Sequence, residues 1–503
     1  MSRSDVVIGL DSSTQSVKAI AWDRQGRAVG EGRAPLGLAN PRPGWYEQDP
    51  EEWWGAAVGA LRGLLDQVEA RRIAGLAIAN QRETVAFLDA AGRPVRPAIT
   101  WIDERSRAVL STVSRDLGAE WLHRTTGKPV DVTPVLYSLA WLKTFEPEAF
   151  ARTARFLDVQ GYLVGRLSGS PRTSWTSADP WALFDIEART WSRPILDYLG
   201  LDETRLAEAH RPGTRLGVVS GEAAAAIGLP QGLPIFAAGG DGQSSGLGTG
   251  TTAPGQAYMN LGTALVSGVW SAHPAVSRYW RTMISATGEG YILEAVQRTG
   301  AFLVNWLADT FAGGKGDPAV FDRLEVAARD LPIGADGLLV LPYWSGCMNP
   351  HWDPDARGCL IGLTPAHGLG HVYRAVLEGL TLETLRAHEA MAEAGVPVER
   401  IVVIGGGAKS RLWTQMVADA SGREVAVQDT VEATALGAGM TAAFGAGWYG
   451  SIREAAEGMG GARCVVRPEA GRVERYRELM DIQGRLYSAN AEIFAALARR
   501  AAG

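Results

Sequence analysis

The stretch VVIGLDSSTQSVKAIAW, residues 6–22, decides how the rest of the chain is interpreted. Apolar residues 6–10 predict a strand, Asp11–Ser16 a polar loop and Val17–Trp22 a second strand, so the segment predicts a β-hairpin. The loop offers hydroxyl and backbone N–H groups to a phosphate, with Lys18 on the strand that follows. Asp11 could hold Mg²⁺ through water, because Mg²⁺ usually takes one or two carboxylates together with phosphate. An ordinary serine- and threonine-rich turn is the alternative.

A second copy of this plan lies roughly 250 residues further along the chain. Tyr258–Thr263 and Ala264–Trp270 again give a strand, a hydroxyl-bearing turn, a strand and a tryptophan. We therefore predict two similar lobes, residues 1–248 and 249–503, with a hinge at Gly246–Gly255. Chance similarity of two hairpins is the alternative.

Size, charge and cysteine content limit the classes of function. At 503 residues the chain is too long for one core and predicts two or three domains. Its net charge of −6 and the lack of a Lys/Arg block speak against nucleic acid or an anionic membrane as partner. The three cysteines lack CxxC spacing, and Asp5 and Asp11 interrupt any signal-like apolar run. We expect a cytoplasmic soluble enzyme.

Strands alternate with helices, which predicts an α/β fold. Asp49-Pro50-Glu51-Glu52 carries three helix-start signals, and that helix is expected to run to about Ala70. Strands are expected at Ile73–Ala79, Val85–Leu88 and Ile401–Ile404. The remaining helices are expected from about Ser410, over the small residues Ala433–Ala443 at a hinge, and as one long closing helix over Ala470–Ala501.

The run AAGGDGQSSGLG, residues 237–248, places a single carboxylate among small residues after an apolar strand. Glycines let another molecule approach the backbone closely. A carboxylate in that position can accept a hydroxyl proton, as a phosphotransferase requires at the attacking oxygen. Asp241 is therefore the candidate catalytic base. An aspartate in a glycine-rich turn is the alternative.

Two further loops could bind phosphate or nucleoside. Gly262-Thr263 forms a turn between strands, and Gly405-Gly406-Gly407-Ala408 precedes a helix, whose N-terminus favours negative charge. Each loop alone is a weak signal. A Walker A sequence and a GxGxxG after the first strand are both missing from the sequence, so the P-loop and Rossmann interpretations fail.

A polar cluster at Asn80–Thr84, with Trp101–Arg105 after the next pair of strands, could bind an acceptor. Arg82 and Glu83 side by side offer a donor and an acceptor of hydrogen bonds to hydroxyl groups. A solvated turn with an ion pair is the alternative.

Together these segments resemble the FGGY carbohydrate kinases, a family with two actin-like (ribonuclease H-like) ATPase lobes and a cleft between them. The resemblance extends from Ile8 to about Ala443, and it is most specific in Gly358–Glu378, which matches the C-terminal signature of the family. It implies an ATP-dependent kinase that uses Mg²⁺ and phosphorylates a small sugar or polyol.

The resemblance also implies roles for individual residues. Asp241 would be the base, and Asp11 and Asp241 would lie near Mg²⁺. The nucleotide side would comprise Ser13, Thr14, Lys18, Gly262, Thr263, Gly406, Gly407, Ala408 and Arg411. The sugar side would comprise Gln81, Arg82, Glu83, Asp103, Asp241 and Gln243.

Several positions depart from the family pattern, and they point to different substrates. Ser13 replaces the usual loop glycine, and Ser138 stands where a lysine is common. Arg82-Glu83 resembles glycerol kinases, but Thr133 and Gly242 do not. Leu341–Gly346 and Pro350-His351 resemble xylulose kinases.

We therefore expect a ketopentose of the xylulose type as acceptor, with glycerol or another polyol as the alternative. An actin-like ATPase without a sugar acceptor, and an inactive sugar sensor, are alternatives from other classes. A homodimer is left open.

Overall fold

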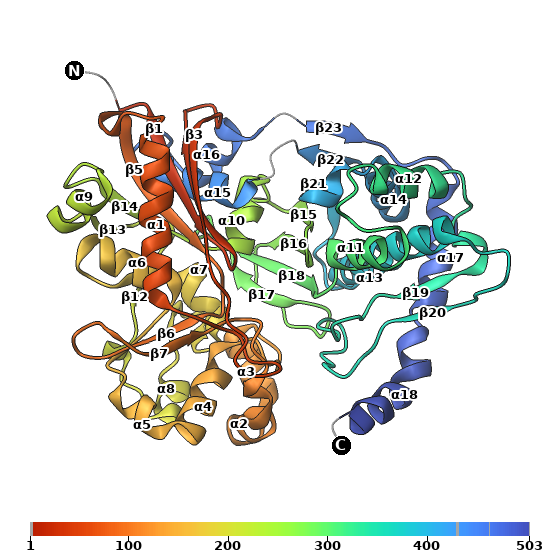
Figure 1. The fold of residues 1–503 in the computed structure, drawn as a ribbon, viewed down its shortest axis with the longest axis horizontal. Coiled ribbons are helices and arrows are strands. Elements are labelled where there is room, and N and C mark those ends of the chain that lie inside the picture. The colour runs from red at the N-terminus through yellow and green to blue at the C-terminus, as the bar shows by residue number, and fades with distance from the viewer. Residues whose placement is uncertain (1–3, 429–431, 462, 502–503) are drawn as a thin grey trace.

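The computed structural model describes residues 4–428, 432–461 and 463–501, and these form two α/β lobes (Figure 1). The first lobe is built on a six-stranded sheet in the order β13–β14–β5–β1–β2–β3. Its strands are β1 (Val6–Ser12), β2 (Ser16–Trp22), β3 (Ala28–Pro35), β5 (Ile73–Asn80), β13 (Arg215–Val218) and β14 (Pro234–Gly240). β1, β5 and β14 run parallel to one another, and the remaining pairs are antiparallel.

The second lobe repeats this strand order. Its seven-stranded sheet has the order β17–β18–β16–β15–β21–β22–β23. The strands are β15 (Gly255–Leu261), β16 (Leu265–Ser271), β17 (Arg281–Ile284), β18 (Tyr291–Gln297), β21 (Val398–Ile404), β22 (Val425–Gln428) and β23 (Arg463–Val466). In both sheets a three-stranded antiparallel meander is followed by two parallel strands beside its first strand. The predicted duplication of the hairpin is therefore confirmed.

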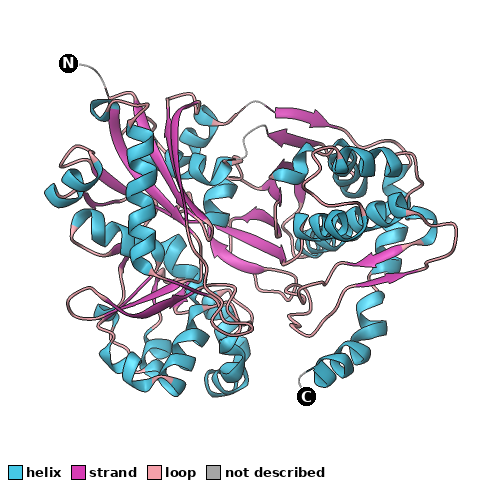
Figure 2. Cartoon of the chain, in the orientation of Figure 1, coloured by secondary structure: helices cyan, strands magenta, loops and turns pink. Residues whose placement is uncertain are grey.

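Helices pack against both faces of the first sheet and form one layer against the second (Figure 2). On the first sheet they are α1 (Pro50–Leu65), α6 (Val159–Ser168), α9 (Gly221–Ile227), α10 (Asp241–Gly248), α15 (Ala433–Gly445) and α16 (Ile452–Met459). On the second they are α11 (Ala301–Phe311), α12 (Val320–Ala328), α13 (Leu369–Glu393), α14 (Arg411–Ser421) and α17 (Arg472–Gln483), with α18 (Leu486–Ala501) projecting from that lobe. The start of α1 is confirmed, since the side chain of Asp49 accepts from Glu51 N, but α1 ends at Leu65 rather than Ala70.

A smaller unit is inserted into the first lobe. It contains a four-stranded sheet of β4 (Glu47–Gln48), β7 (Pro94–Ile99), β6 (Val85–Leu88) and β8 (Arg155–Leu157). Its helices are α2 (Leu110–Leu117), α3 (Ala119–Thr126), α4 (Val135–Phe145), α5 (Pro147–Arg152), α7 (Trp175–Ala178) and α8 (Arg193–Leu199). Short strand pairs complete the fold: β9 (Arg172–Ser174) with β12 (Glu208–His210), β10 (Phe184–Asp185) with β11 (Thr190–Trp191), and β19 (Leu339–Leu341) with β20 (Cys359–Ile361).

The small-residue helix α15 packs on the first sheet although it follows the second in sequence. Alternate residues of a strand face opposite sides, so Ile8 and Leu10 pack with α1 whereas Val7 packs with α15 and α16. Gly9 lets the helix approach, because a Cβ there would lie 1.9 Å from Ala435 O. Trp22 Nε1 donates to the same carbonyl at 3.1 Å. The domain boundary at 248/249 stays a prediction.

The C-terminal segment differs from the expected single helix over Ala470–Ala501. It forms two helices, α17 and α18, separated at Gly484-Arg485. A Cβ at position 484 would lie 2.2 Å from Arg386 Nη1, so the backbone there passes directly against a guanidinium group of α13. Apolar spacing alone gives no sign of this contact. No helix within the described residues has the length and apolar character needed to span a membrane.

Candidate active site

The carboxyl ends of β1, β5 and β14 meet at one edge of the first sheet. Ser12 pairs with Asn80, and Asn80 pairs with Gly240. Ligands of open α/β sheets bind outside this edge. The strand register therefore gathers the Asp11 loop, the Asn80–Thr84 cluster and Asp241 at one place, although they are far apart in the sequence.

Asp241 is the first residue of α10 and is reachable from solvent. Its side chain is 39% exposed, and its Oδ1 lies 3.0 Å from Arg82 Nε. Gly242 N donates to the same oxygen at 2.8 Å. The carboxylate is thus oriented by an arginine and a backbone N–H while part of it stays open to an incoming hydroxyl group.

Asp11 is a buried carboxylate whose Oδ1 has no hydrogen-bond partner within the described part of the chain. Burial raises its pKa to about 7, an effect that Lys18 opposes and that the charge of Asp241 reinforces. A bound divalent cation would supply the missing partner and favour the charged carboxylate. The described residues contain no cluster of three His, Cys, Asp or Glu side chains that could hold a metal by themselves. Two carboxylates with water and phosphate, the usual surroundings of Mg²⁺, fit this site.

Lys18, predicted on the nucleotide side, forms an ion pair with Glu432 at 2.9 Å. Glu432 also accepts from Arg33 at 2.7 Å, and it directly precedes α15. A pair that joins segments so distant in sequence could not be anticipated from the local pattern around residue 18.

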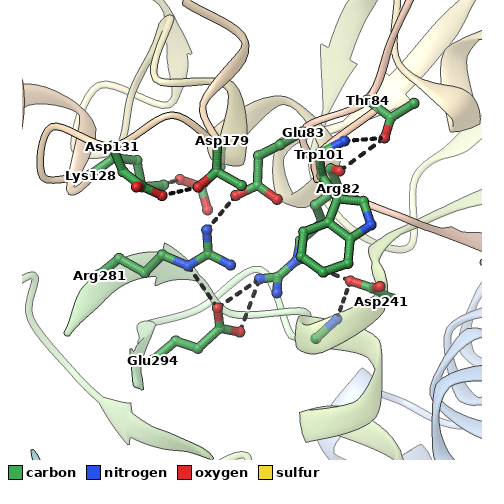
Figure 3. A network of polar contacts seen from close by, with 12 residues as sticks. Arg82, Glu83, Thr84, Trp101, Lys128, Asp131, Asp179, Asp241, Arg281 and Glu294 are labelled. Atoms are coloured by element: carbon green, nitrogen blue, oxygen red, sulfur yellow. Dashed lines mark hydrogen bonds and ion pairs between the residues drawn. The ribbon is translucent and has the colours of Figure 1, made fainter. Parts of the chain in front are cut away.

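Arg82 and Glu83 belong to a buried chain of alternating charges that reaches into the second lobe (Figure 3). Arg82 Nη1 donates to both oxygens of Glu294 on β18, at 3.1 and 2.9 Å. Arg281 of β17 donates from Nε to Glu294 Oε1 at 2.9 Å and from Nη1 to Glu83. Burial alone would raise the pKa of Glu294, but Arg82 and Arg281 outweigh it and lower the value to about 2. The backbone of Glu83 has φ 50°, a conformation that residues other than glycine rarely adopt.

Sequence reasoning missed Glu294 and Arg281. The signal available was a charged residue inside an otherwise apolar strand, because Glu294 interrupts the run Tyr291–Val296 and is fully buried. A buried charge without a partner is costly, so such a residue calls for a cation nearby. The sequence gives no indication which cation.

The other residues predicted on the sugar side form hydrogen bonds within the protein. Gln81 donates to Gln48 Oε1 at 2.8 Å. Gln243 accepts from Arg82 Nη1 at 3.3 Å and donates to Thr176 O at 3.1 Å. Asp103 accepts from Tyr46 N at 2.6 Å and from the guanidinium group of Arg105 at 2.7 and 2.8 Å. Both oxygens of Asp103 are therefore occupied, and its side chain is 1% exposed.

The first loop closes on itself around Ser13. Ser13 N and Ser13 Oγ both donate to Ser16 O, at 3.0 and 2.9 Å. The serine that replaces the usual glycine is thus accommodated by its own turn. Thr14 Oγ1 accepts from Trp101 Nε1 at 2.9 Å, which joins this loop to the segment after β7.

The loops predicted to bind nucleotide come together at the matching edge of the second sheet. Asn260 of β15 pairs with Ile404 of β21, so the Gly262-Thr263 turn and the Gly405–Ala408 loop are neighbours. Gly405 has φ 89°, and a Cβ there would lie 2.4 Å from Asn260 Oδ1. A Cβ at Gly406 would meet nothing within 4 Å, so its surroundings are open.

The last two predicted nucleotide-side residues follow this loop. Ala408 lies in the short 3₁₀ turn Gly406–Lys409. Arg411 is exposed at the first position of α14, after the N-cap Ser410.

A cavity in the second lobe lies away from these residues. It measures about 230 Å³ and is lined by residues of α13, of the α17–α18 junction and of the loop after β19. The residues predicted from sequence to form the site do not line it.

Comparison with known proteins covers nearly the whole chain. Residues 6–248 match the model of the N-terminal domain of the FGGY family of carbohydrate kinases, and residues 257–446 match that of its C-terminal domain. The chain is 30% identical over 500 residues to a xylulose kinase of Bacillus subtilis, with 98% of each chain covered. It is 32% identical over 474 residues to a glycerol kinase of Bordetella parapertussis, covering 90% of this chain and 91% of that one. The crystal structure of a xylulose kinase from Rhodospirillum rubrum superposes with a TM-score of 0.89 at 28% identity, covering 97% of this chain and 100% of that one.

Proposed function

Because the chain belongs to the FGGY family of carbohydrate kinases, phosphotransferases that use ATP and a sugar hydroxyl, we propose that its acceptor is a ketopentose of the xylulose type. The observation that carries the proposal is the half-open carboxylate of Asp241, oriented by Arg82 at the edge of the first sheet. An acceptor hydroxyl placed there can lose its proton to Asp241 as its oxygen attacks the γ-phosphoryl group.

The proposed nucleotide side is the Gly262-Thr263 turn with the Gly405–Ala408 loop and Arg411. Backbone N–H groups at such loops suit phosphate oxygens, and the open surroundings of Gly406 leave room for a nucleoside. Mg²⁺ held near Asp11 and Asp241 would neutralise charge that develops on the phosphates. Asp11 must then be ionised, which a neighbouring cation favours over the buried, protonated form.

The xylulose assignment is supported by the segment Leu341–Gly346 with Pro350-His351, and by the similarity to named xylulose kinases over the full length. A polyol such as glycerol is the second candidate, because the neighbouring charged side chains of Arg82 and Glu83 offer hydroxyl groups a donor and an acceptor. The similarity to a named glycerol kinase also supports it. Assembly as a homodimer and a cytoplasmic location stay predictions.

A coupled assay of ADP release tests the proposal. D-Xylulose, D-ribulose, D-xylose, glycerol and erythritol are offered singly with ATP and Mg²⁺. We expect the highest kcat/KM with a ketopentose. A clear preference for glycerol or erythritol would replace the ketopentose by the polyol, and turnover that does not depend on any acceptor would contradict both.

A further inference from the structure

The acceptor side of the proposed site has more carboxylates than guanidinium groups. Arg82 and Arg281 face Asp241, Glu294 and Glu83. The adjacent Lys128 forms its own ion pair with Asp179, and this pair adds no net charge. Counted as ionised side chains and without a bound cation, two positive groups against three negative ones leave the cluster with one negative charge in excess.

Glu294 holds the central place in this cluster. It is fully buried, contacts both guanidinium groups, and accepts from Tyr258 Oη at 3.3 Å. Arg82 is directed by it toward Asp241, and Arg281 toward Glu83 (Figure 3). Without its charge, Arg82 would be paired with Asp241 and Arg281 with Glu83, and the cluster would be neutral.

The charge balance bears on the acceptor. Recognition of a carboxylate requires a cation that is not already neutralised, commonly an arginine that can form two parallel hydrogen bonds. Among the residues that the structure describes in this cluster, each guanidinium group already contacts two carboxylates. A sugar acid placed here would meet excess negative charge in a site of low dielectric constant, whereas an uncharged sugar would not.

We propose that Glu294 determines the charge specificity of the acceptor site, restricting it to uncharged polyhydroxy compounds and excluding sugar acids. This inference rests on the proposed function, because it places the acceptor beside Arg82 and Asp241. Glu294 acts through the two arginines and is therefore a specificity-determining, positioning residue rather than a catalytic one.

Two ligands of equal length separate charge from size. D-Gluconate and sorbitol are six-carbon polyols that differ in one terminal group, a carboxylate in the first and a CH₂OH group in the second. Their dissociation constants are measured by titration calorimetry on the full-length protein with Mg²⁺ and ADP. Calorimetry needs no turnover, so the proposal stays testable even if the acceptor panel shows no kinase activity.

We expect the wild-type protein to bind sorbitol more tightly than gluconate. Glu294→Gln removes one buried negative charge and should shift the ratio of the two affinities toward gluconate by about 10-fold or more. Glu294→Asp keeps the charge but shortens the side chain, so it should weaken both ligands and leave their ratio near that of the wild type. Glu378→Gln is the matched control, a buried glutamate of α13 paired with Arg374 at 2.9 Å, and it should leave both affinities unchanged.

Three results would overturn the assignment. Tighter binding of gluconate than of sorbitol by the wild type would show that the site accepts acids. An unchanged ratio in Glu294→Gln would show that the charge of Glu294 does not set specificity. A shift of equal size in Glu294→Asp would show that side-chain geometry is responsible. Failure of the proposed function is separate, since it appears as a lack of acceptor-dependent ADP release in the wild type.

Discussion

Replacing Asp11 by asparagine should change how the stability of the protein depends on pH. The pKa of Asp11 is raised from 3.8 to about 7 because the carboxyl group is buried, while Lys18 only partly offsets this effect. Between pH 5 and pH 7 the folded protein therefore holds a proton on Asp11 that the unfolded chain has lost. Raising the pH across this range lowers the free energy of unfolding of the wild type. Asp11→Asn does not show this loss because the asparagine side chain carries no titratable proton in this range.

The magnitude follows from the linkage between pKa and stability. One pKa unit corresponds to about 1.4 kcal/mol, so two pH units below the folded pKa of about 7 correspond to about 3 kcal/mol. The comparison of two pH values cancels any constant cost of the asparagine amide. Melting temperatures are measured by scanning fluorimetry at half-unit steps from pH 5 to pH 8, with EDTA present. Between pH 5 and pH 8, the melting temperature of Asp11→Asn should rise by several degrees relative to that of the wild type.

A control separates burial from metal binding. Asp158 is also buried, with its pKa raised by burial to about 6, and its side chain caps α6. Asp158→Asn should show a smaller pH-dependent gain of the same sign. Adding Mg²⁺ and ADP should stabilise the wild type and Asp158→Asn at pH 8, but not Asp11→Asn. A difference in melting temperature between Asp11→Asn and the wild type that is the same at pH 5 and pH 8 would refute the reasoning.

Three further predictions concern catalysis and closure. Asp241→Asn should leave ATP binding within a few-fold of the wild type but lower phosphoryl transfer by about 10²–10⁴, because the amide cannot accept the proton; near-normal turnover in a coupled assay would remove Asp241 from the role of base. Glu83→Ala should raise the acceptor KM roughly 10-fold or more with little change in the KM for ATP, since a charged group that bonds a hydroxyl contributes ~1.5–3 kcal/mol. A change in melting temperature alone would make Glu83 a structural partner of Arg281. Small-angle scattering should give a smaller radius of gyration with a nucleotide analogue and sugar together than for the apo protein, and an unchanged profile would argue against lobe closure as the step that excludes water.

Local signals predicted most of the fold. The hairpin of β1 and β2, its counterpart of β15 and β16, and the start of α1 all depend on neighbours in sequence, so strand alternation and capping residues were sufficient. The break between α17 and α18 lies against Arg386, about a hundred residues away in sequence, and apolar spacing does not predict it.

The candidate site divides in the same way. Asp241, Arg82 and Asp11 were identified because each follows an apolar strand, and parallel pairing brings such strand ends together. Lys18 pairs with Glu432 and Asp103 with Arg105, contacts that the sequence did not indicate, and their assignment to ligands stays a prediction. Glu294 and Arg281 reach the site from the other lobe, and only the packing of the lobes reveals their role.

The packing of α15 and α16 on the first sheet has a consequence for how the chain is synthesised. Ala435, Leu436 and Met440 of α15, with Ile452 and Met459, complete the apolar layer over β1 and β5. A nascent chain that has left the ribosome only as far as residue 248 still lacks this layer, so the half that is made first is finished last. Separate expression of residues 1–248 should accordingly give an insoluble fragment, and supplying residues 249–503 in trans should recover it. The folding of the first half of this kinase therefore depends on residues that are translated after it.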